Sequence, residues 1–191
     1  MKAATEVRWH GRGGQGAVTG AKVFAETALS GGKFVQAFPE YGPERMGAPL
    51  RAYNRISSKP ISIHCQVTNP DVVVVVDATL LQGANVLEGT NDDVILLVNT
   101  HEDSKSVRNQ LNMKTGKVYT VNASKIAMDT IGRPMPNTPM LGAMAKVSGL
   151  ITLEHLLKDI EKNFSKKFSE KVVKANLSAV QYAYDAVSTE D

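Results

Sequence analysis

The stretch Asp71-Val72-Val73-Val74-Val75-Val76-Asp77 is a run of five valines closed by an acid. β-Branched residues favour strands, and a strand that is apolar at every position must be covered on both of its faces. Strands of this kind lie in the middle of parallel sheets, between layers of helices. We therefore expect a central strand of a parallel sheet here.

Two later segments, residues 92–99 and 117–122, repeat this pattern with helical intervals between them. Strands that alternate with helices give an α/β fold with right-handed crossovers. Beyond residue 122 the apolar periodicity predicts a mostly helical block. Its expected helices cover residues 124–131, 140–149, 153–164 and 169–187.

The chain before the valine run predicts a strand at residues 6–10, a glycine-rich turn, a helix from residue 17 and a second strand at residues 33–38. Residues 50–56 and 61–66, joined around Ser57-Ser58-Lys59-Pro60, predict an antiparallel hairpin. We expect a single three-layer α/β/α domain over residues 1–191. Its sheet would be mostly parallel with an added β-hairpin, in a Rossmann-like arrangement.

The composition is that of a globular protein, with 42% hydrophobic and 21% charged residues in a chain of 191 residues. A net charge of +3, with lysine concentrated near the C-terminus, predicts no nucleic-acid partner. The lysine-rich stretch 162–174 is expected to be a solvated helical face. No stretch approaches the roughly 18 apolar residues of a membrane span, and the first residues lack the apolar core of a signal peptide.

The single cysteine, Cys65, cannot form an internal disulfide, hold an iron–sulfur cluster or build a structural zinc site. A reducing, cytoplasmic location is therefore expected. Cys65 falls in a predicted strand and is expected to be a buried small residue. The four histidines, His10, His64, His101 and His155, lack metal-site spacing, and most are expected to be surface or satisfied core residues.

The glycine-rich turn, Gly11-Arg12-Gly13-Gly14-Gln15-Gly16, fits the dinucleotide-binding fingerprint. Such a turn lets the backbone approach a ligand, and the N-terminus of the following helix favours an anion. The fingerprint also needs an acid at the end of the second strand, but residues 33–38 have none and Glu40 lies beyond a proline. Three interpretations stay open: a complete NAD(P) or flavin site, a wall of an active site shared with other chains, and tight strand–helix packing.

Polar residues end several of the predicted strands on one rim of the sheet. Asp77 ends the central strand, where α/β sheets bind ligands, although capping of the next helix is the favoured role. Asn99, Asn122 and the pair Asn137-Thr138 add uncharged hydrogen-bonding groups to this rim. Such groups suit binding and positioning better than proton transfer.

Residues 39–49, with the sequence PEYGPERMGAP, mix prolines, glycines and charges and predict a structured loop. Aromatic, methionine and arginine side chains are enriched at the buried centres of interfaces. We expect Tyr41, Glu44, Arg45 and Met46 to serve a subunit interface or an active site, with an ordinary loop as the alternative.

Three motifs follow one another along the chain: HGRGGQG at residues 10–16, YGPERMGAP at residues 41–49 and NTPMLGA at residues 137–143. Nearly the whole chain resembles the gamma subunit of the 2-oxoacid:ferredoxin oxidoreductases, most closely the pyruvate type. The resemblance implies a non-redox subunit of a hetero-oligomer with alpha, beta and delta (ferredoxin-like) subunits. That complex converts pyruvate, CoA and oxidised ferredoxin to acetyl-CoA, CO₂ and reduced ferredoxin. Met46 departs from the pattern, because many relatives would carry a second basic residue there.

The resemblance further implies that thiamine diphosphate, Mg²⁺ and [4Fe–4S] clusters are bound by partner subunits, with CoA as co-substrate. No catalytic residue, metal or cofactor would belong to this chain alone. By position, the candidates for contacting CoA or a cofactor are Gly11, Arg12, Gly13, Gly14, Gln15, Gly16, Asn137 and Thr138, and those for subunit contact are Tyr41, Glu44, Arg45 and Met46. The alternatives are a subunit acting on 2-ketoisovalerate or 2-oxoglutarate, a free-standing NAD(P) or flavin oxidoreductase, and a purely structural adaptor.

Overall fold

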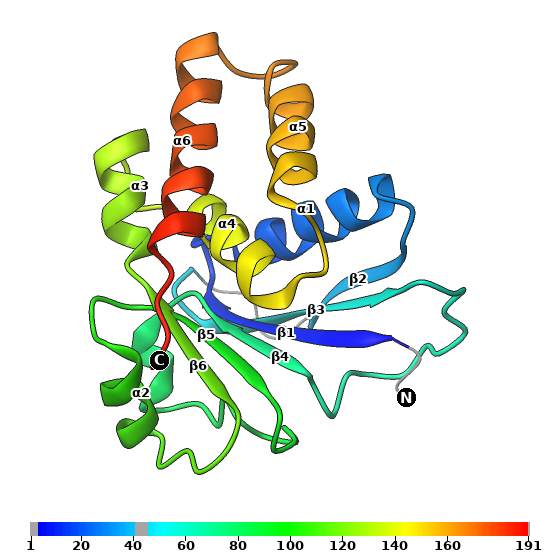
Figure 1. The fold of residues 1–191 in the computed structure, drawn as a ribbon, viewed down its shortest axis with the longest axis vertical. Helices are drawn as coiled ribbons and strands as arrows, with labels where there is room; N and C mark the ends of the chain where they lie inside the picture. Colours follow the sequence, from blue (N-terminus) through cyan, green and yellow to red (C-terminus); the bar gives the residue numbers. More distant parts are fainter. Residues whose placement is uncertain (1–3, 41–45, 191) are drawn as a thin grey trace.

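The valine run lies at the centre of the sheet, as its composition predicts. The structure, a computed structural model, describes residues 4–40 and 46–190, which contain six strands in the order β2-β3-β1-β4-β5-β6 (Figure 1). The strands are β1 (Thr5–Arg12), β2 (Phe34–Glu40), β3 (Pro49–Ser57), β4 (Val72–Val75), β5 (Ile95–Asn99) and β6 (Lys117–Val121). The helices of the same residues are α1 (Ala17–Ser30), the 3₁₀ turn η1 (Ala78–Leu81), α2 (Ser104–Gln110), α3 (Ala123–Ile131), α4 (Asn137–Ser148), α5 (Leu153–Phe164) and α6 (Glu170–Ala186).

The strand β4 is covered on both faces. It pairs in parallel with β1 on one side and with β5 on the other. Val72 and Val74 belong to the apolar cluster that includes residues of α1, α4 and α6, whereas Val73 and Val75 belong to a second cluster that includes residues of η1 and α2. Because successive side chains of a strand point to opposite faces, an all-apolar strand requires this double cover. The three-layer α/β/α prediction is therefore confirmed.

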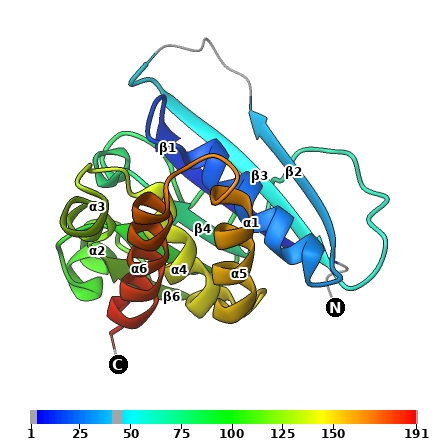
Figure 2. The same ribbon diagram turned by 90° about the horizontal axis from the view of Figure 1, so that it is seen from above.

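The two helical layers are unequal. Helices α1, α3, α4, α5 and α6 lie on one side of the sheet and α2 lies on the other, with α1 beside β2 and β3 (Figures 1 and 2). Helix α4 is almost wholly buried in the thick layer. A Cβ atom on Gly142 of α4 would lie 2.0 Å from the carbonyl oxygen of Val180 in α6, so glycine is what allows these two helices to touch.

A buried hydrogen-bonded chain fastens α1 to the sheet. The indole Nε1 of Trp9 in β1 donates to Oδ1 of Asn54 in β3 at 2.7 Å, and Nδ2 of Asn54 donates to the carbonyl of Ala21 in α1 at 2.9 Å. Trp9 also packs edge-on against Phe24 of α1 with ring centroids 6.1 Å apart. Since buried polar groups are costly when unpaired, this chain fixes one register between helix and strands.

The predicted hairpin of residues 50–56 and 61–66 is wrong. β3 is antiparallel to β1 on one side and to β2 on the other, so both of its edges are occupied before residue 61 is reached. Residues 61–66 consequently form no strand. Cys65, expected to be buried in that strand, is exposed, because without sheet pairing no second layer covers it.

The helical block is confirmed, and α5 has the predicted bounds. The expected helical interval between β4 and β5 is a single 3₁₀ turn, η1. Over the ranges that the structure describes, no helix is long and apolar enough to cross a membrane.

Candidate functional site

The glycine turn, residues 11–16, joins β1 to α1 at the carboxyl end of the parallel strands. β1 continues to Arg12, so Gly11 lies within the strand and the turn itself occupies residues 13–16. Gly16 precedes α1 with φ of +76°, and no side chain in the described part of the chain caps this helix end. The N–H groups of the first turn of α1 therefore face outward without a side-chain acceptor.

The first and third sequence motifs meet at this turn. A Cβ atom on Gly16 would lie 2.8 Å from Cγ and Nδ2 of Asn137, the first residue of α4. Thr138 follows it and is buried, with 6% of its surface exposed. Of the pair Asn137-Thr138, the structure brings Asn137 to the glycine turn.

The second motif also reaches the glycine turn through its last residues. The N–H of Gly13 donates to the carbonyl of Ala48 at 2.9 Å, and the N–H of Gly47 donates to the carbonyl of Gly13 at 3.1 Å. Met46 lies beside Gly14 and has 93% of its surface exposed. Tyr41, Glu44 and Arg45, also predicted for this surface, lie outside the described residues.

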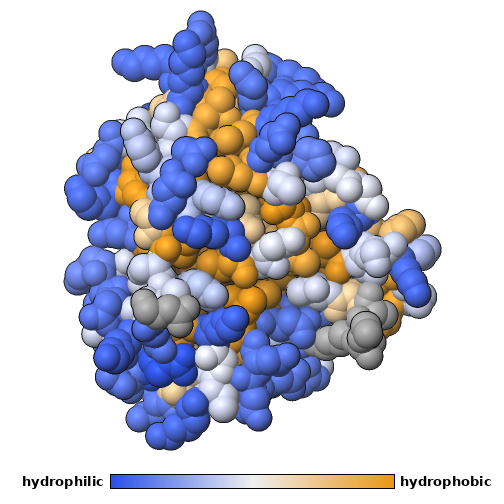
Figure 3. All heavy atoms as spheres, in the orientation of Figure 1, coloured by the Kyte–Doolittle hydropathy of each residue, from blue (hydrophilic) through white to orange (hydrophobic). Residues whose placement is uncertain are grey.

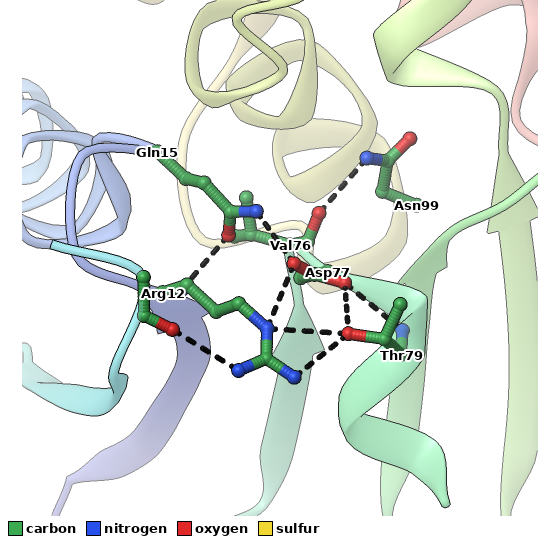
Figure 4. A network of polar contacts seen from close by, with 7 residues as sticks. Arg12, Gln15, Val76, Asp77, Thr79 and Asn99 are labelled. Atoms are coloured by element: carbon green, nitrogen blue, oxygen red, sulfur yellow. Dashed lines mark hydrogen bonds and ion pairs between the residues drawn. The ribbon is translucent and has the colours of Figure 1, made fainter.

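Arg12 and Gln15 both bind Asp77, the residue that follows the valine run (Figure 4). Gln15 Nε2 donates to Asp77 Oδ2 at 2.5 Å, and Arg12 Nε lies 3.2 Å from the same oxygen. The Arg12 guanidinium also donates to Thr79 Oγ1 at 3.0 Å and to the Gly47 carbonyl at 3.1 Å. This network ties the glycine turn to the end of the central strand.

Asp77 caps the 3₁₀ turn that follows the central strand. Its Oδ1 accepts the N–H of Thr79 at 2.9 Å and so caps η1, which confirms the favoured interpretation. Burial opposes its ionisation, but the hydrogen bonds from Thr79 and Gln15 and the charge of Arg12 outweigh burial and hold the pKa of Asp77 below its ordinary value. The carboxylate is therefore ionised at neutral pH and balances the charge of Arg12.

A cleft of about 680 Å³ opens beside this network. Gln15 and Asp77 form one side of it, and Asn99 and Asn122 line it from the ends of β5 and β6. Further lining residues are Ser124 of α3, Pro134 and Pro136 before α4, and His101 and Glu102 after β5. The cleft lies at the carboxyl ends of the parallel strands, which is where open α/β sheets bind ligands.

The two asparagines of the cleft are engaged with the backbone. Asn99 Nδ2 donates to the carbonyl of Val76 at 2.8 Å, and its Oδ1 accepts the N–H of Ser124 at 3.1 Å. Asn122 Oδ1 accepts the N–H of Lys125 at 3.1 Å and caps α3. The prediction that these residues share one rim is confirmed, and their hydrogen bonds keep the rim in shape.

A buried pair on β1 was missed from the sequence. Arg8 and His10 are each 2% exposed, and Arg8 Nε donates to His10 Nε2 at 3.0 Å. Arg8 Nη2 also donates to the carbonyls of Val86 and Glu88 at 2.9 and 2.7 Å. Burial, together with the charges of Arg8 and Arg51, lowers the pKa of His10 to about 3, so His10 is a neutral core histidine. The alternation of Arg8 and His10 with Val7 and Trp9 is the sequence signal that places both on one face.

The acid of a dinucleotide site is not positioned here. The sequence predicts a second strand that ends at Phe38, with Glu40 in the next loop, but β2 continues through Pro39 to Glu40. β3 nevertheless separates β2 from β1. Glu40 Oε2 accepts the hydroxyl of Tyr53 at 2.5 Å. In the dinucleotide fold the acid ends the strand next to β1 and reaches the ribose there. A complete dinucleotide pocket therefore does not form around the glycine turn.

The site offers hydrogen-bonding groups and a cation, the Arg12 guanidinium. Within residues 4–40 and 46–190, no group of three or more His, Cys, Asp or Glu side chains is placed to hold a metal ion. The residues do not fit a magnesium diphosphate or an iron–sulfur cluster, whereas an uncapped helix end and an arginine fit an anionic ligand.

The fold and this edge define a three-layer α/β protein with a glycine turn and an arginine beside a polar cleft. The chain belongs to the pyruvate ferredoxin/flavodoxin oxidoreductase family, whose model matches residues 6–186. The resemblance that the three motifs indicate is thereby confirmed.

Proteins with similar sequences carry names that fit this family. The chain is 52% identical to pyruvate synthase subunit PorC of Thermotoga maritima over 95% of this chain and 94% of that protein. It is 47% identical to the pyruvate/ketoisovalerate oxidoreductases common subunit gamma of Pyrococcus abyssi, over 92% of this chain and 95% of that protein. The crystal structure of pyruvate oxidoreductase subunit PORC from Thermotoga maritima superimposes with a TM-score of 0.88 and 47% identity, covering 100% of both chains. Relatives of this kind are subunits of multi-subunit 2-oxoacid oxidoreductases.

Proposed function

We propose that this chain is the gamma subunit of a pyruvate:ferredoxin oxidoreductase, which converts pyruvate, CoA and oxidised ferredoxin to acetyl-CoA, CO₂ and reduced ferredoxin. One observation carries the proposal: the three motifs converge at the carboxyl end of β1, where Gly16 meets Asn137 and Gly13 pairs with Gly47 and Ala48. The names of relatives that match 95% and 92% of the chain support the assignment.

In this proposal the chain builds and closes the active site without reacting itself. Thiamine diphosphate with Mg²⁺ and the [4Fe–4S] clusters, bound by the alpha, beta and delta subunits, would supply carbanion stabilisation and electron transfer to ferredoxin. The chain's single cysteine and its engaged carboxylate, Asp77, fit this division of labour. The complex would work in the cytoplasm.

The glycine turn is the part proposed to contact CoA, whose phosphates suit the N-terminus of α1 and the Arg12 guanidinium. An arginine has five N–H donors. The contacts found in the described part of the chain occupy Nε and one N–H on each terminal nitrogen of Arg12, which leaves two donors for a phosphate. Gln15 is bound to Asp77 and acts by positioning. Asn137 adds an amide beside the turn, and the buried Thr138 follows it.

The loop before β3 is proposed to contact a partner subunit through Tyr41, Glu44, Arg45 and Met46. Met46 supports this role, since a large apolar side chain that is 93% exposed next to the glycine turn favours cover by another chain. The glycine turn, as the proposed CoA contact, and the loop before β3, as the proposed subunit contact, would then be neighbours.

A second 2-oxoacid is a candidate substrate beside pyruvate. Several relatives are named as a gamma subunit common to pyruvate and ketoisovalerate oxidoreductases. 2-Ketoisovalerate is therefore a candidate substrate of the assembled enzyme beside pyruvate. A free-standing NAD(P) or flavin enzyme is disfavoured, because β3 separates the strand ending in Glu40 from β1.

Purification of the tagged full-length chain from its own cells tests the proposal. The expected result is co-purification of alpha, beta and delta subunits, the brown colour of iron–sulfur clusters, and reduction of ferredoxin that requires both CoA and pyruvate or 2-ketoisovalerate. A chain that purifies alone and binds NAD(P) or a flavin at micromolar concentration by calorimetry would contradict it.

A further inference from the structure

The helices α5 and α6 form a hairpin that stands away from the sheet (Figure 1). Its outer end, residues 161–174, is called the hairpin tip, and it carries five lysines and two glutamates, a net charge of +3. The whole chain also has a net charge of +3, so the rest of the chain is balanced and the entire positive excess lies on the tip. The lysines are Lys162, Lys166, Lys167, Lys171 and Lys174.

These lysines are poorly neutralised by the chain itself. Lys174 pairs with Glu170 at 2.5 Å, and no other lysine of the tip has a carboxylate partner among the described residues. A solvated helical face usually mixes both signs at i,i+4 spacing, because like charges at that spacing repel one another. A cluster of unpaired lysines at the end of a projecting hairpin therefore favours an acidic partner.

Apolar side chains lie among the lysines. Phe168 is 49% exposed and Val172 is 39% exposed, and Phe164 packs against Phe168 with ring centroids 5.4 Å apart. An interface centre combines such apolar side chains with a charged rim. The tip likewise combines Phe164, Phe168 and Val172 with the surrounding lysines.

A groove continues from the tip toward the body of the protein. It has a volume of about 490 Å³ and lies between α5 and α6, where Leu157, Leu177 and the exposed Tyr182 line it. Figure 3 shows apolar atoms along the gap between the two helices, with hydrophilic side chains on both sides. A groove of this volume is large enough to accept apolar side chains from a partner.

We propose that the hairpin tip and this groove form a docking surface for an acidic segment of another subunit of the oxidoreductase, one whose carboxylates surround a large apolar side chain. The proposal rests on the assignment of the chain to a multi-subunit enzyme. A nucleic acid or an anionic lipid surface would use the lysines but leave the apolar side chains of the groove without a partner. The tip also contains no arginine, the side chain that binds phosphate in bidentate fashion.

The test compares variants of this chain co-expressed with the other subunits. K166E/K167E/K171E reverses three charges of the tip, and K105E/K114E/K117E makes the same charge change on exposed lysines of α2, its following loop and β6. We expect the tip variant to join the complex about tenfold more weakly at low salt, with a reduced salt dependence, and the control to assemble as the wild type does. Tyr182→Ala, which removes an exposed groove residue, should weaken assembly several-fold at every salt concentration.

Cross-linking with a carbodiimide, which joins lysine to carboxylate, identifies the partner. The expected product links Lys166, Lys167 or Lys171 to an Asp or Glu of another subunit. A tip variant that assembles as the wild type does, cross-links confined to this chain, or selective binding of the wild-type complex to DNA or to anionic vesicles would overturn the proposal. A wild-type chain that joins no complex would instead contradict the proposed function. The KM for CoA, measured in the fraction of the tip variant that assembles, should equal that of the wild type, because the tip is not part of the proposed CoA site.

Discussion

A Cβ atom placed on Gly16 would lie 2.8 Å from the side-chain amide of Asn137, so the turn after β1 and the start of α4 fit together because residue 16 has no side chain. The φ of +76° at Gly16 reinforces this requirement, since side chains strain that backbone conformation. Two residues from distant motifs are thereby packed together, next to Gln15 and Pro136, which line the cleft.

Gly16→Ala should destabilise the folded chain by about 2–3 kcal/mol in urea unfolding, because left-handed strain and the Asn137 contact add together. Gly32→Ala is the matched control, since Gly32 has φ of +83° and a Cβ there would meet nothing within 4 Å. The control should cost about 1 kcal/mol. Equal losses for the two variants would show that the contact with Asn137 contributes nothing.

Asp77→Asn should lower the free energy of unfolding by about 1–3 kcal/mol at pH 7, because hydrogen bonds from Gln15 and Thr79 and the pairing with Arg12 are weakened. The pKa of Asp77 is lowered from 3.8 in the folded state, so its stabilisation is present above the unfolded value and is lost as the pH falls through the folded value. Urea unfolding at pH 7 and pH 3 should therefore show the wild type and the variant converging in acid. A difference that is the same at both pH values would refute this account of Asp77.

His10→Gln should flatten the acid limb of the stability curve. The pKa of His10 is lowered from 6.5 to about 3, so between these values the unfolded chain binds one more proton. Stability is therefore present above pH 6.5 and falls by about 1.4 kcal/mol per pH unit below it. The substituted glutamine would keep an acceptor for Arg8 and remove the titration. An unaltered slope in His10→Gln would contradict the assignment.

The sequence predicts most of the fold because its strongest signals are local. Five valines in succession can be satisfied only between two layers, and the helical block after residue 122 is periodic enough to give the bounds of α5. Residues 61–66 were mispredicted because strand propensity does not report whether a sheet edge is free. β2 and β1 had already occupied both edges of β3.

The sequence predicts which residues make up the site but not which of them contact one another. The glycine turn, Asp77, Asn99 and Asn122 were placed on one rim from the order of strands and helices alone. That Arg12 and Gln15 bind Asp77, and that Asn137 meets Gly16, depends on contacts between distant segments. Glu40 shows the same limit, since its distance from β1 follows from the strand order, which no local pattern fixes.

The KM for CoA of the assembled enzyme carrying Arg12→Ala tests most directly whether this chain contributes the glycine turn to a CoA site. Lys117→Ala is the control, since Lys117 begins β6 at the opposite end of the parallel strands. Loss of a charged hydrogen bond to phosphate should raise the KM for CoA about tenfold in Arg12→Ala, with the KM for the 2-oxoacid nearly unchanged and the control like the wild type. A fully assembled Arg12→Ala enzyme with the wild-type KM for CoA would contradict this contribution.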